Sequence, residues 1–204
     1  MKTIEKRTDW YQSVEHPSKV IEACGIGSRS MADMDRRWDL ICAHTTIEGK
    51  RFLDVGCAEG GFLVRAAKAG AGSLALIEID KTRRERAKDS LAKWGYRARP
   101  AQSELCVNTP AADVVICFSM LHYVRHVFWF LDRVCEATNE VLFFEFAVLP
   151  EQDDKIVYRG KEKEGLLLPW WLLRDRMSKS GTVEVLCDPD TTKTGRRVIG
   201  CLRK

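Results

Sequence analysis

Short apolar runs alternate with amphipathic segments along most of the chain. Runs that are rich in β-branched and aromatic residues predict buried strands, which we place at 51–56, 74–79, 113–118 and 140–146. Apolar residues at helical spacing predict helices between these strands, at 60–69, 81–94 and 126–137. Because strands that alternate with helices are joined by right-handed crossovers, the pattern predicts an α/β fold with a doubly wound, mostly parallel sheet.

The first part of the chain lacks this alternation. Apolar side chains from Met31 to Ile41 recur at helical spacing, which predicts a helix there. We therefore expect residues 1–45 to be a helical cap that packs against a main domain of residues 46–204. A length of 204 residues, of which 45% are hydrophobic and 30% charged, suits one globular domain with a sizeable core.

The last part of the chain also changes character. Residues 150–165 are polar, charged and aperiodic, which predicts a surface loop of the kind that often carries specificity. A helix is expected at 169–179, followed by strands at 182–187 and 197–202. The turn-rich residues between these two strands predict an antiparallel β-hairpin on one edge of the sheet. A weaker strand is expected at 96–99.

Composition bounds the location and the redox chemistry of the protein. No apolar run approaches the roughly 20 residues that cross a bilayer, and the first ten residues are too polar for a signal peptide. We therefore expect a cytoplasmic protein with no membrane association. The eight cysteines are scattered singly without a C-x-x-C pair, which predicts reduced thiols, and the four dispersed histidines predict no metal site.

The most informative passage is a glycine-rich turn between the first two predicted strands. Asp54 lies near the end of the first strand and is followed by Gly56, Gly60, Gly61 and a helix. Glycines allow a tight turn and the close approach of a ligand, and unpaired amides at the start of a helix favour an anionic group. About 20 residues further on, Glu78 ends the next strand, where a carboxylate can accept hydrogen bonds from both hydroxyls of a ribose.

Two kinds of cofactor could use such a turn. A dinucleotide is one, since Gly56, Ala58 and Gly61 match G-x-G-x-x-G apart from the middle glycine. S-adenosylmethionine is favoured because Asp54 places a carboxylate where a pyrophosphate is repelled and the ammonium group of a methionine moiety is attracted. A dinucleotide-binding fold also needs a second βαβαβ half, and the sequence predicts a β-hairpin in its place.

The same residues resemble a known family, the class I S-adenosylmethionine-dependent methyltransferases, from about residue 51 to residue 204. The stretch DVGCAEG at 54–60 is similar to their first motif. The resemblance implies a Rossmann-like, doubly wound sheet of seven mostly parallel strands with a C-terminal antiparallel β-hairpin, and S-adenosylmethionine as the cofactor. The residues that it implies for cofactor binding are Asp54, Gly56, Cys57, Ala58, Gly60, Glu78, Ile79, Gln102, Ser103 and Ser119.

Individual roles follow from the same resemblance. Glu78 matches the acid that binds the ribose, and Asp80, which is also the expected N-cap of the next helix, is the alternative. Gln102 and Ser103 are the best match to the residues that contact adenine. Ser119 follows the strand whose end lies beside the transferred methyl group. If the acceptor is a hydroxyl, a base helps, and His122 is the candidate catalytic residue because an imidazole titrates near neutral pH.

The sequence leaves more than one class of acceptor open. Residues 119–122 read S-M-L-H, unlike the N-P-P-Y or D-P-P-Y of DNA base-amino methyltransferases, and we expect first an oxygen or nitrogen of a small molecule. A basic run at 81–88 keeps RNA as a second acceptor. Residues 37–71 also faintly resemble the tRNA wobble-uridine branch, which includes transferases that use a carboxylated cofactor. A non-catalytic partner subunit with the same fold and a nicotinamide-dependent reductase are further alternatives. The oligomeric state is not predicted.

Overall fold

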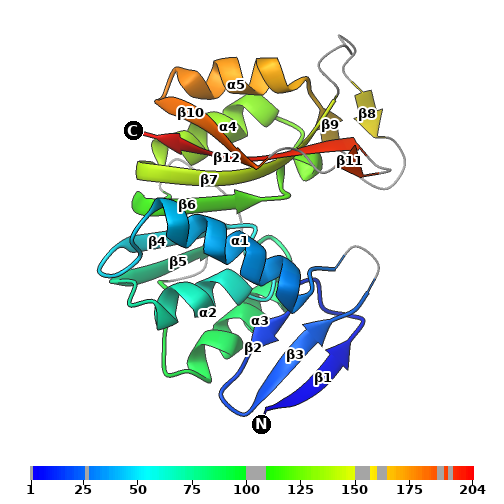
Figure 1. Ribbon diagram of the computed structural model, residues 1–204, viewed down its shortest axis with the longest axis vertical. Helices are drawn as coiled ribbons and strands as arrows, with labels where there is room; N and C mark the ends of the chain where they lie inside the picture. The colour runs from blue at the N-terminus through cyan, green and yellow to red at the C-terminus, as the bar shows by residue number, and fades with distance from the viewer. Residues whose placement is uncertain are drawn as a thin grey trace. The chain divides into compact units, whose positions relative to one another are not determined.

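The computed structural model describes residues 2–25, 28–99, 109–149, 157–159, 165–187, 191–192 and 195–204. The chain divides into two compact units, Met1–Glu104 and Leu105–Lys204. In Figure 1 the first unit runs from blue to green and the second from green to red, and each contains both strands and helices. Both units are therefore α/β in composition, as the alternation of the sequence predicts.

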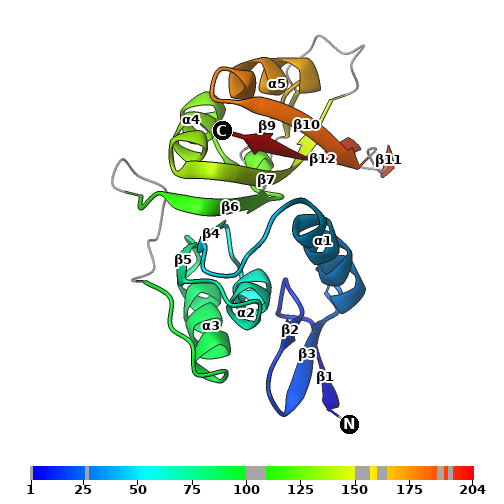
Figure 2. The same cartoon turned by 60° about the vertical axis from the view of Figure 1, so that its left-hand side comes forward.

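The first unit is built on a parallel pair of strands, β4 (Arg51–Val55) and β5 (Ser73–Ile77), with Asp54 opposite Leu76. Helix α2 (Gly61–Lys68) connects the two strands, and α3 (Lys81–Ala92) follows β5. The two helices pack against each other, as Figures 1 and 2 show. All residues of β4 after the first are buried, which explains the continuous apolar run in this strand and leaves Asp54 as its one acid.

The N-terminal part of the first unit corrects one expectation. Helix α1 (Met31–His44) forms as predicted, and the Ser30 side chain caps it by accepting a hydrogen bond from the N–H of Asp33. The described residues before it, 2–25 and 28–30, are not helical. They form a small sheet in the order β1–β3–β2, with strands β1 (Thr3–Arg7), β2 (Val14–Glu15) and β3 (Lys19–Ala23).

The physical reason for this difference lies in the residue types. Val14 and Ile21 are β-branched and buried, and they face each other across the antiparallel β2–β3 pair. Pro17, between these strands, disfavours a continuous helix. The helical cap is therefore correct for α1 and wrong for residues 3–23, and the domain boundary after residue 45 stays a prediction.

The second unit contains a four-stranded path in the order β10–β12–β7–β6. Strands β6 (Ala112–Phe118) and β7 (Thr138–Val148) are parallel and are connected through α4 (Val127–Glu136). The chain then continues through α5 (Trp170–Ser178) to β10 (Thr182–Cys187) and β12 (Gly195–Arg203). Phe144 lies at the centre of this unit, where its ring stacks on Phe146 and contacts Trp170.

The C-terminal hairpin is confirmed, with one refinement. Strand β12 is antiparallel to β10 and also to β7, so β12 lies between them and β10 is the outer strand of the hairpin. The burial of Val198, Cys201 and Leu202 agrees with a central position for β12, whereas Glu184 and Val185 of β10 are exposed. Seven strands carry the predicted Rossmann-like α/β arrangement, namely β4 and β5 in the first unit and β6, β7, β10, β11 (Thr191–Thr192) and β12 in the second.

Two smaller expectations change. Residues 96–99 form no strand, although the Arg99 N–H donates one hydrogen bond to the carbonyl of Leu74. The stretch expected as an aperiodic loop contains β8 (Val157–Arg159), which pairs antiparallel with β9 (Gly165–Leu167).

In the part of the chain that the structure describes, no helix has the length and apolar character to cross a membrane. Of the described cysteines, Cys24 and Cys42 are exposed, and the buried ones are Cys57, Cys117, Cys135 and Cys201.

Candidate active site

Every second residue of the glycine-rich turn between β4 and α2, from Gly56 to Gly60, has a positive φ. Gly56 has a φ of 80° and its N–H donates to the carbonyl of Ile77 at 2.8 Å. Ala58 has a φ of 46° and Gly60 a φ of 80°. Left-handed backbone is costly for residues with a Cβ, so a glycine would be favoured at the position that Ala58 occupies. The turn therefore keeps its shape only where its surroundings stabilise it.

Asp54 lies at the base of this turn in a buried position, with 2% of its surface exposed. Its Oδ2 atom has no hydrogen-bond partner among the described residues. Burial, together with the neighbouring Glu78 carboxylate, raises the pKa of Asp54 well above its ordinary value. A buried carboxylate oxygen without a partner is suited to receive a cation or a hydrogen-bond donor from a ligand.

Glu78 is bound to the same turn. Its Oε2 atom accepts a hydrogen bond from the N–H of Ala58 at 2.9 Å, and its Oε1 atom accepts one from the N–H of Asp80 at 2.9 Å. Each carboxylate oxygen has two acceptor positions, so Glu78 can accept further hydrogen bonds from a ligand. The Asp80 side chain is engaged elsewhere, because it caps α3 by accepting from the N–H of Arg83. Ile79, between the two acids, is 75% exposed.

The start of α2 departs from the expectation of unpaired amides. The Gly60 N–H donates to the carbonyl of Cys57 at 2.8 Å, and the Gly61 N–H donates to Oε1 of Gln12 at 3.2 Å. Both amides are therefore paired, that of Gly60 within the turn and that of Gly61 with the segment after β1. Gln12 was not a candidate from the sequence, since nothing in its local pattern connects it to a turn that lies 49 residues later.

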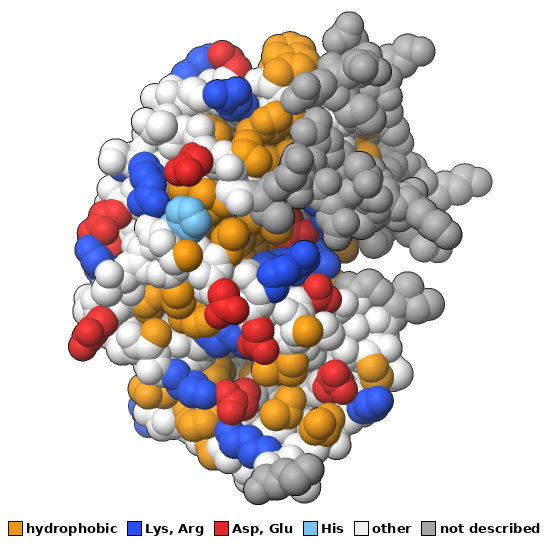
Figure 3. Space-filling model, in the orientation of Figure 1, with side chains coloured by type: hydrophobic (Ala, Val, Ile, Leu, Met, Phe, Trp, Pro, Cys, Tyr) orange, Lys and Arg blue, Asp and Glu red, His pale blue; other side chains and the backbone are white. Residues whose placement is uncertain are grey.

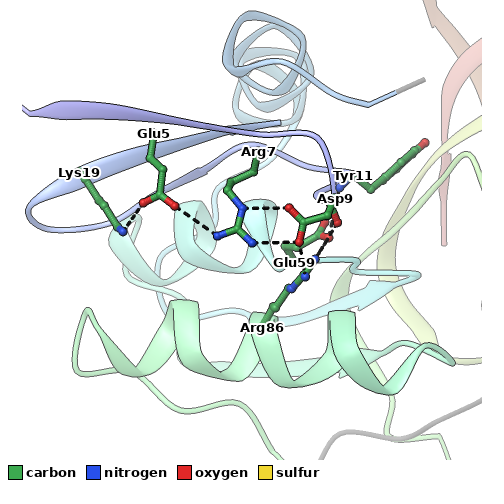
Figure 4. Close-up of polar contacts among 7 residues, drawn as sticks. All are labelled: Glu5, Arg7, Asp9, Tyr11, Lys19, Glu59 and Arg86. Carbon is green, nitrogen blue, oxygen red and sulfur yellow. Dashed lines mark hydrogen bonds and ion pairs between the residues drawn. The ribbon is translucent and has the colours of Figure 1, made fainter. Parts of the chain in front are cut away.

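Glu59 explains why that segment lies there. It is fully buried, and its carboxylate accepts hydrogen bonds from the N–H groups of Tyr11 and Gln12. Burial raises the pKa of Glu59, while the two backbone donors and the Arg83 charge oppose the rise. Figure 4 shows Glu59 beside Asp9 and Arg86, with Arg86 reaching both acids from α3. Glu59 belongs to the DVGCAEG motif at 54–60, but the sequence predicts no role for its side chain.

In the second unit, Ser119 directly follows β6 and has a φ of 58°. Its N–H donates to the carbonyl of Glu145 at 2.8 Å, and its hydroxyl accepts from Nη1 of Arg197 at 2.9 Å. The same Nη1 atom donates to Oε1 of the fully buried Glu145 at 2.9 Å. The sequence offered no signal for this arrangement beyond the basic character of Arg197, because its members come from three different strands or strand ends.

His122 lies four residues after β6, in the short 3₁₀ turn Leu121–Tyr123. The ring is buried, with 8% of the residue exposed, whereas Tyr123 is 46% exposed. The centroids of the two rings lie 4.2 Å apart. The structure thus places His122 just beyond Ser119 in the same unit. Gln102 and Ser103, the candidates for adenine contact, lie outside the described residues.

Comparison with known proteins shows which family this chain resembles. A family model described as "Methyltransferase domain" matches residues 30–182. A ubiquinone biosynthesis O-methyltransferase from Methylococcus capsulatus is 36% identical over 92 residues, which are 43% of this chain and 38% of that relative. A tRNA U34 carboxymethyltransferase from Ectopseudomonas mendocina is 43% identical over 44 residues, which are 22% of this chain and 14% of that relative.

Solved structures agree on the fold. The N-terminal domain of EvdMO1 with S-adenosylhomocysteine bound has a TM-score of 0.70 and 20% identity, and the match covers 96% of this chain and 91% of that one. The matched stretches of the two curated relatives span well under half of their own lengths. The family match, in contrast, spans most of this chain and includes the glycine-rich turn. The chain therefore belongs to the methyltransferase domain family, with the fold and first motif of the class I S-adenosylmethionine-dependent methyltransferases.

Proposed function

We propose that the protein transfers a methyl group from S-adenosylmethionine to an oxygen or nitrogen of a small-molecule acceptor. The observation that carries this proposal is the buried Oδ2 atom of Asp54, which has no hydrogen-bond partner among the residues that the structure describes and lies next to a turn with left-handed residues. An ammonium group would supply the missing donor and the opposite charge. A pyrophosphate would place negative charge against the same carboxylate, which disfavours a dinucleotide and hence a reductase.

In this proposal the first unit holds the cofactor. Asp54 binds the ammonium of the methionine moiety, and the backbone of Gly56, Cys57, Ala58 and Gly60 lines its amino-acid end. Glu78 keeps acceptor capacity for the ribose hydroxyls while its bond to Ala58 fixes its orientation. The exposed Ile79 offers an apolar surface for the adenine ring, and Gln102 and Ser103 remain the proposed polar contacts of that ring.

The second unit is proposed to serve the acceptor. The bound cofactor supplies a methyl group on a positively charged sulfonium, so the task of the protein is to align the acceptor and to exclude water. Ser119 is the residue proposed beside the reacting groups, and Arg197 and Glu145 hold its side chain and backbone in place. His122, a few residues away, is proposed to accept the proton of a hydroxyl acceptor.

A small molecule is favoured over RNA by the way in which the basic run of α3 is used. Arg86 is ion-paired with Asp9, and Arg84 donates to the carbonyl of Glu78. The Arg83 guanidinium lies over the ring of Tyr11 at 5.4 Å. These cations bind neighbouring parts of the protein. On the face shown in Figure 3, basic side chains are interspersed with acidic ones, unlike the continuous basic surface that binds phosphates.

A tRNA acceptor is the second candidate, because of the local identity to the carboxymethyltransferase. Incubation with cofactor labelled in the transferred group, in a cell extract then separated into RNA, protein and small-molecule fractions, distinguishes the two. Label in the small-molecule fraction supports the first proposal. Label in RNA supports the second and overturns the first.

Calorimetry with S-adenosylhomocysteine and with NADH tests the cofactor itself, and binding of NADH alone would overturn both.

A further inference from the structure

Two backbone amides of the N-terminal segment are held by one carboxylate of the glycine-rich turn. The Tyr11 N–H donates to Oε1 of Glu59 at 3.1 Å, and the Gln12 N–H donates to Oε2 at 2.9 Å. Glu59 is 0% exposed. A carboxylate removed from water is stable only where donors replace its hydration, so these bonds, together with the ion pair to Arg86 at 3.6 Å, hold the Glu59 side chain in place.

The side chain of Gln12 makes a second hydrogen bond between the N-terminal segment and the turn. Its Oε1 atom accepts from the N–H of Gly61, the first residue of α2, at 3.2 Å. A Cβ atom at Gly61 would lie 2.9 Å from the carbonyl oxygen of Ser13 and 2.7 Å from Cε of Met34. Gly61 thus makes room for the N-terminal segment. The start of α2 and residues 11–13 are in close contact, with hydrogen bonds running in both directions.

The turn is held from its other side as well. Ala58, the residue before Glu59, donates its N–H to Glu78. Ala58 and Gly60, which flank Glu59, both have positive φ values. Left-handed backbone on both sides of a residue requires support from outside the turn, particularly where one of the two is alanine. That support comes from Glu78, which accepts from Ala58, and from the amides of Tyr11 and Gln12, which hold the Glu59 carboxylate.

We propose that Glu59 is a positioning residue for the cofactor, which holds the backbone of residues 56–61 in its ligand-binding shape by anchoring it to Tyr11 and Gln12. This inference rests on the proposed cofactor site. Glu59 acts through the turn and is not assigned a contact with the ligand. Because ligand and N-terminal segment stabilise the same turn conformation, binding of one strengthens the docking of the other.

The surrounding ion pairs provide a control. Figure 4 shows Glu5 between Lys19 and Arg7 on the small sheet, away from the turn. The Glu5 side chain is 36% exposed, and pairs of this kind contribute little to stability. Glu5→Gln is therefore a carboxylate-to-amide change on the same sheet that removes no direct contact of Glu59, Tyr11 or Gln12.

The test compares Glu59→Gln, Gln12→Met and Glu5→Gln in the full chain, with S-adenosylhomocysteine as the probe. The amide of Glu59→Gln turns a donor towards one of the two N–H groups, so we expect affinity by calorimetry to fall about tenfold. Gln12→Met removes only the acceptor for Gly61, and we expect a loss of about fivefold. Glu5→Gln should bind as tightly as the unaltered chain.

Two further readouts separate positioning from a merely structural role. The probe should raise the melting temperature of Glu59→Gln by less than it raises that of the unaltered chain. Hydrogen exchange at the amides of Tyr11 and Gln12 should slow on binding in the unaltered chain, and this slowing should be lost in Glu59→Gln. Lower melting temperatures with unchanged affinity in both variants would overturn the inference alone. No binding by the unaltered chain would overturn the proposed cofactor site, and this inference with it.

Discussion

The carboxylate of Glu78 and the backbone N–H of Ala58 form a hydrogen bond of 2.9 Å that joins the end of β5 to the glycine-rich turn. The acid that we propose for the ribose therefore also fixes the turn that we propose for the amino-acid end of the cofactor. A substitution at Glu78 is expected to disturb both ends of the ligand. The size of its effect depends on which hydrogen-bond acceptors the new side chain keeps.

Substitution of Glu78 should separate these contributions. Glu78→Gln keeps one acceptor oxygen, and we expect affinity for S-adenosylhomocysteine to fall by about tenfold. Glu78→Ala removes both oxygens and leaves the Ala58 N–H without its partner, so a loss of about 100-fold or more is expected. Calorimetry measures both values, with Glu85→Gln on the exposed face of α3 as the control. Equal affinity of Glu78→Ala and the unaltered chain would exclude Glu78 from the site.

Asp54 should make the ligand-free protein less stable as the pH rises. Burial raises its pKa in the folded state, so between the ordinary carboxyl pKa and this raised value the folded protein holds a proton that the unfolded chain has lost. Stability therefore declines as the pH rises through that interval. Asp54→Asn should flatten the decline and raise the melting temperature near neutral pH, while Asp89→Asn, an exposed change on α3, should not. Identical pH profiles for all three proteins would contradict this account.

Cofactor binding should release a proton from the same group. The ammonium of the ligand favours the charged form of Asp54 and so lowers its pKa in the complex. Affinity should therefore increase as the pH rises through the interval in which free Asp54 is protonated. Calorimetry in buffers with different ionisation enthalpies should show buffer-dependent binding heat for the unaltered chain. Asp54→Asn should bind more weakly and should lose the Asp54 part of this dependence.

The Arg197–Glu145 pair should be the most sensitive ionic contact of the second unit. Arg197→Met removes an ionic partner of a fully buried carboxylate, which typically costs about 3 kcal/mol or more, and the partial exposure of Arg197 reduces our expectation to about 2 kcal/mol. Urea unfolding measures this loss. In Arg197→Met/Glu145→Gln, part of the stability should return, with a coupling of about 1 kcal/mol. Strict additivity of the two single changes would show that the pair is not coupled.

Local residue patterns predicted strands β4, β5, β6, β7, β10 and β12, the helices between them and the order in which these elements occur. The apolar run before Gly56, the glycines after it and the acid at Glu78 predicted a βαβ unit, because turn glycines and buried strands are properties of neighbouring residues. The same locality explains the correct N-cap at Asp80 and the correct helix at α1. The error over residues 3–23 arose because the helical spacing that begins at Met31 was extended to β-branched residues that precede it.

Contacts between distant segments were decided only by the tertiary structure. Glu59 and Gln12 are 47 residues apart, and Arg197 and Ser119 are 78 residues apart, yet each pair is joined by a hydrogen bond. No periodicity or motif connects such positions, because their proximity depends on how the strands pair and on which face each side chain occupies. The sequence thus identified the turn and the acids that it proposed for the cofactor, whereas the residues that hold them in place became visible only once the chain was folded.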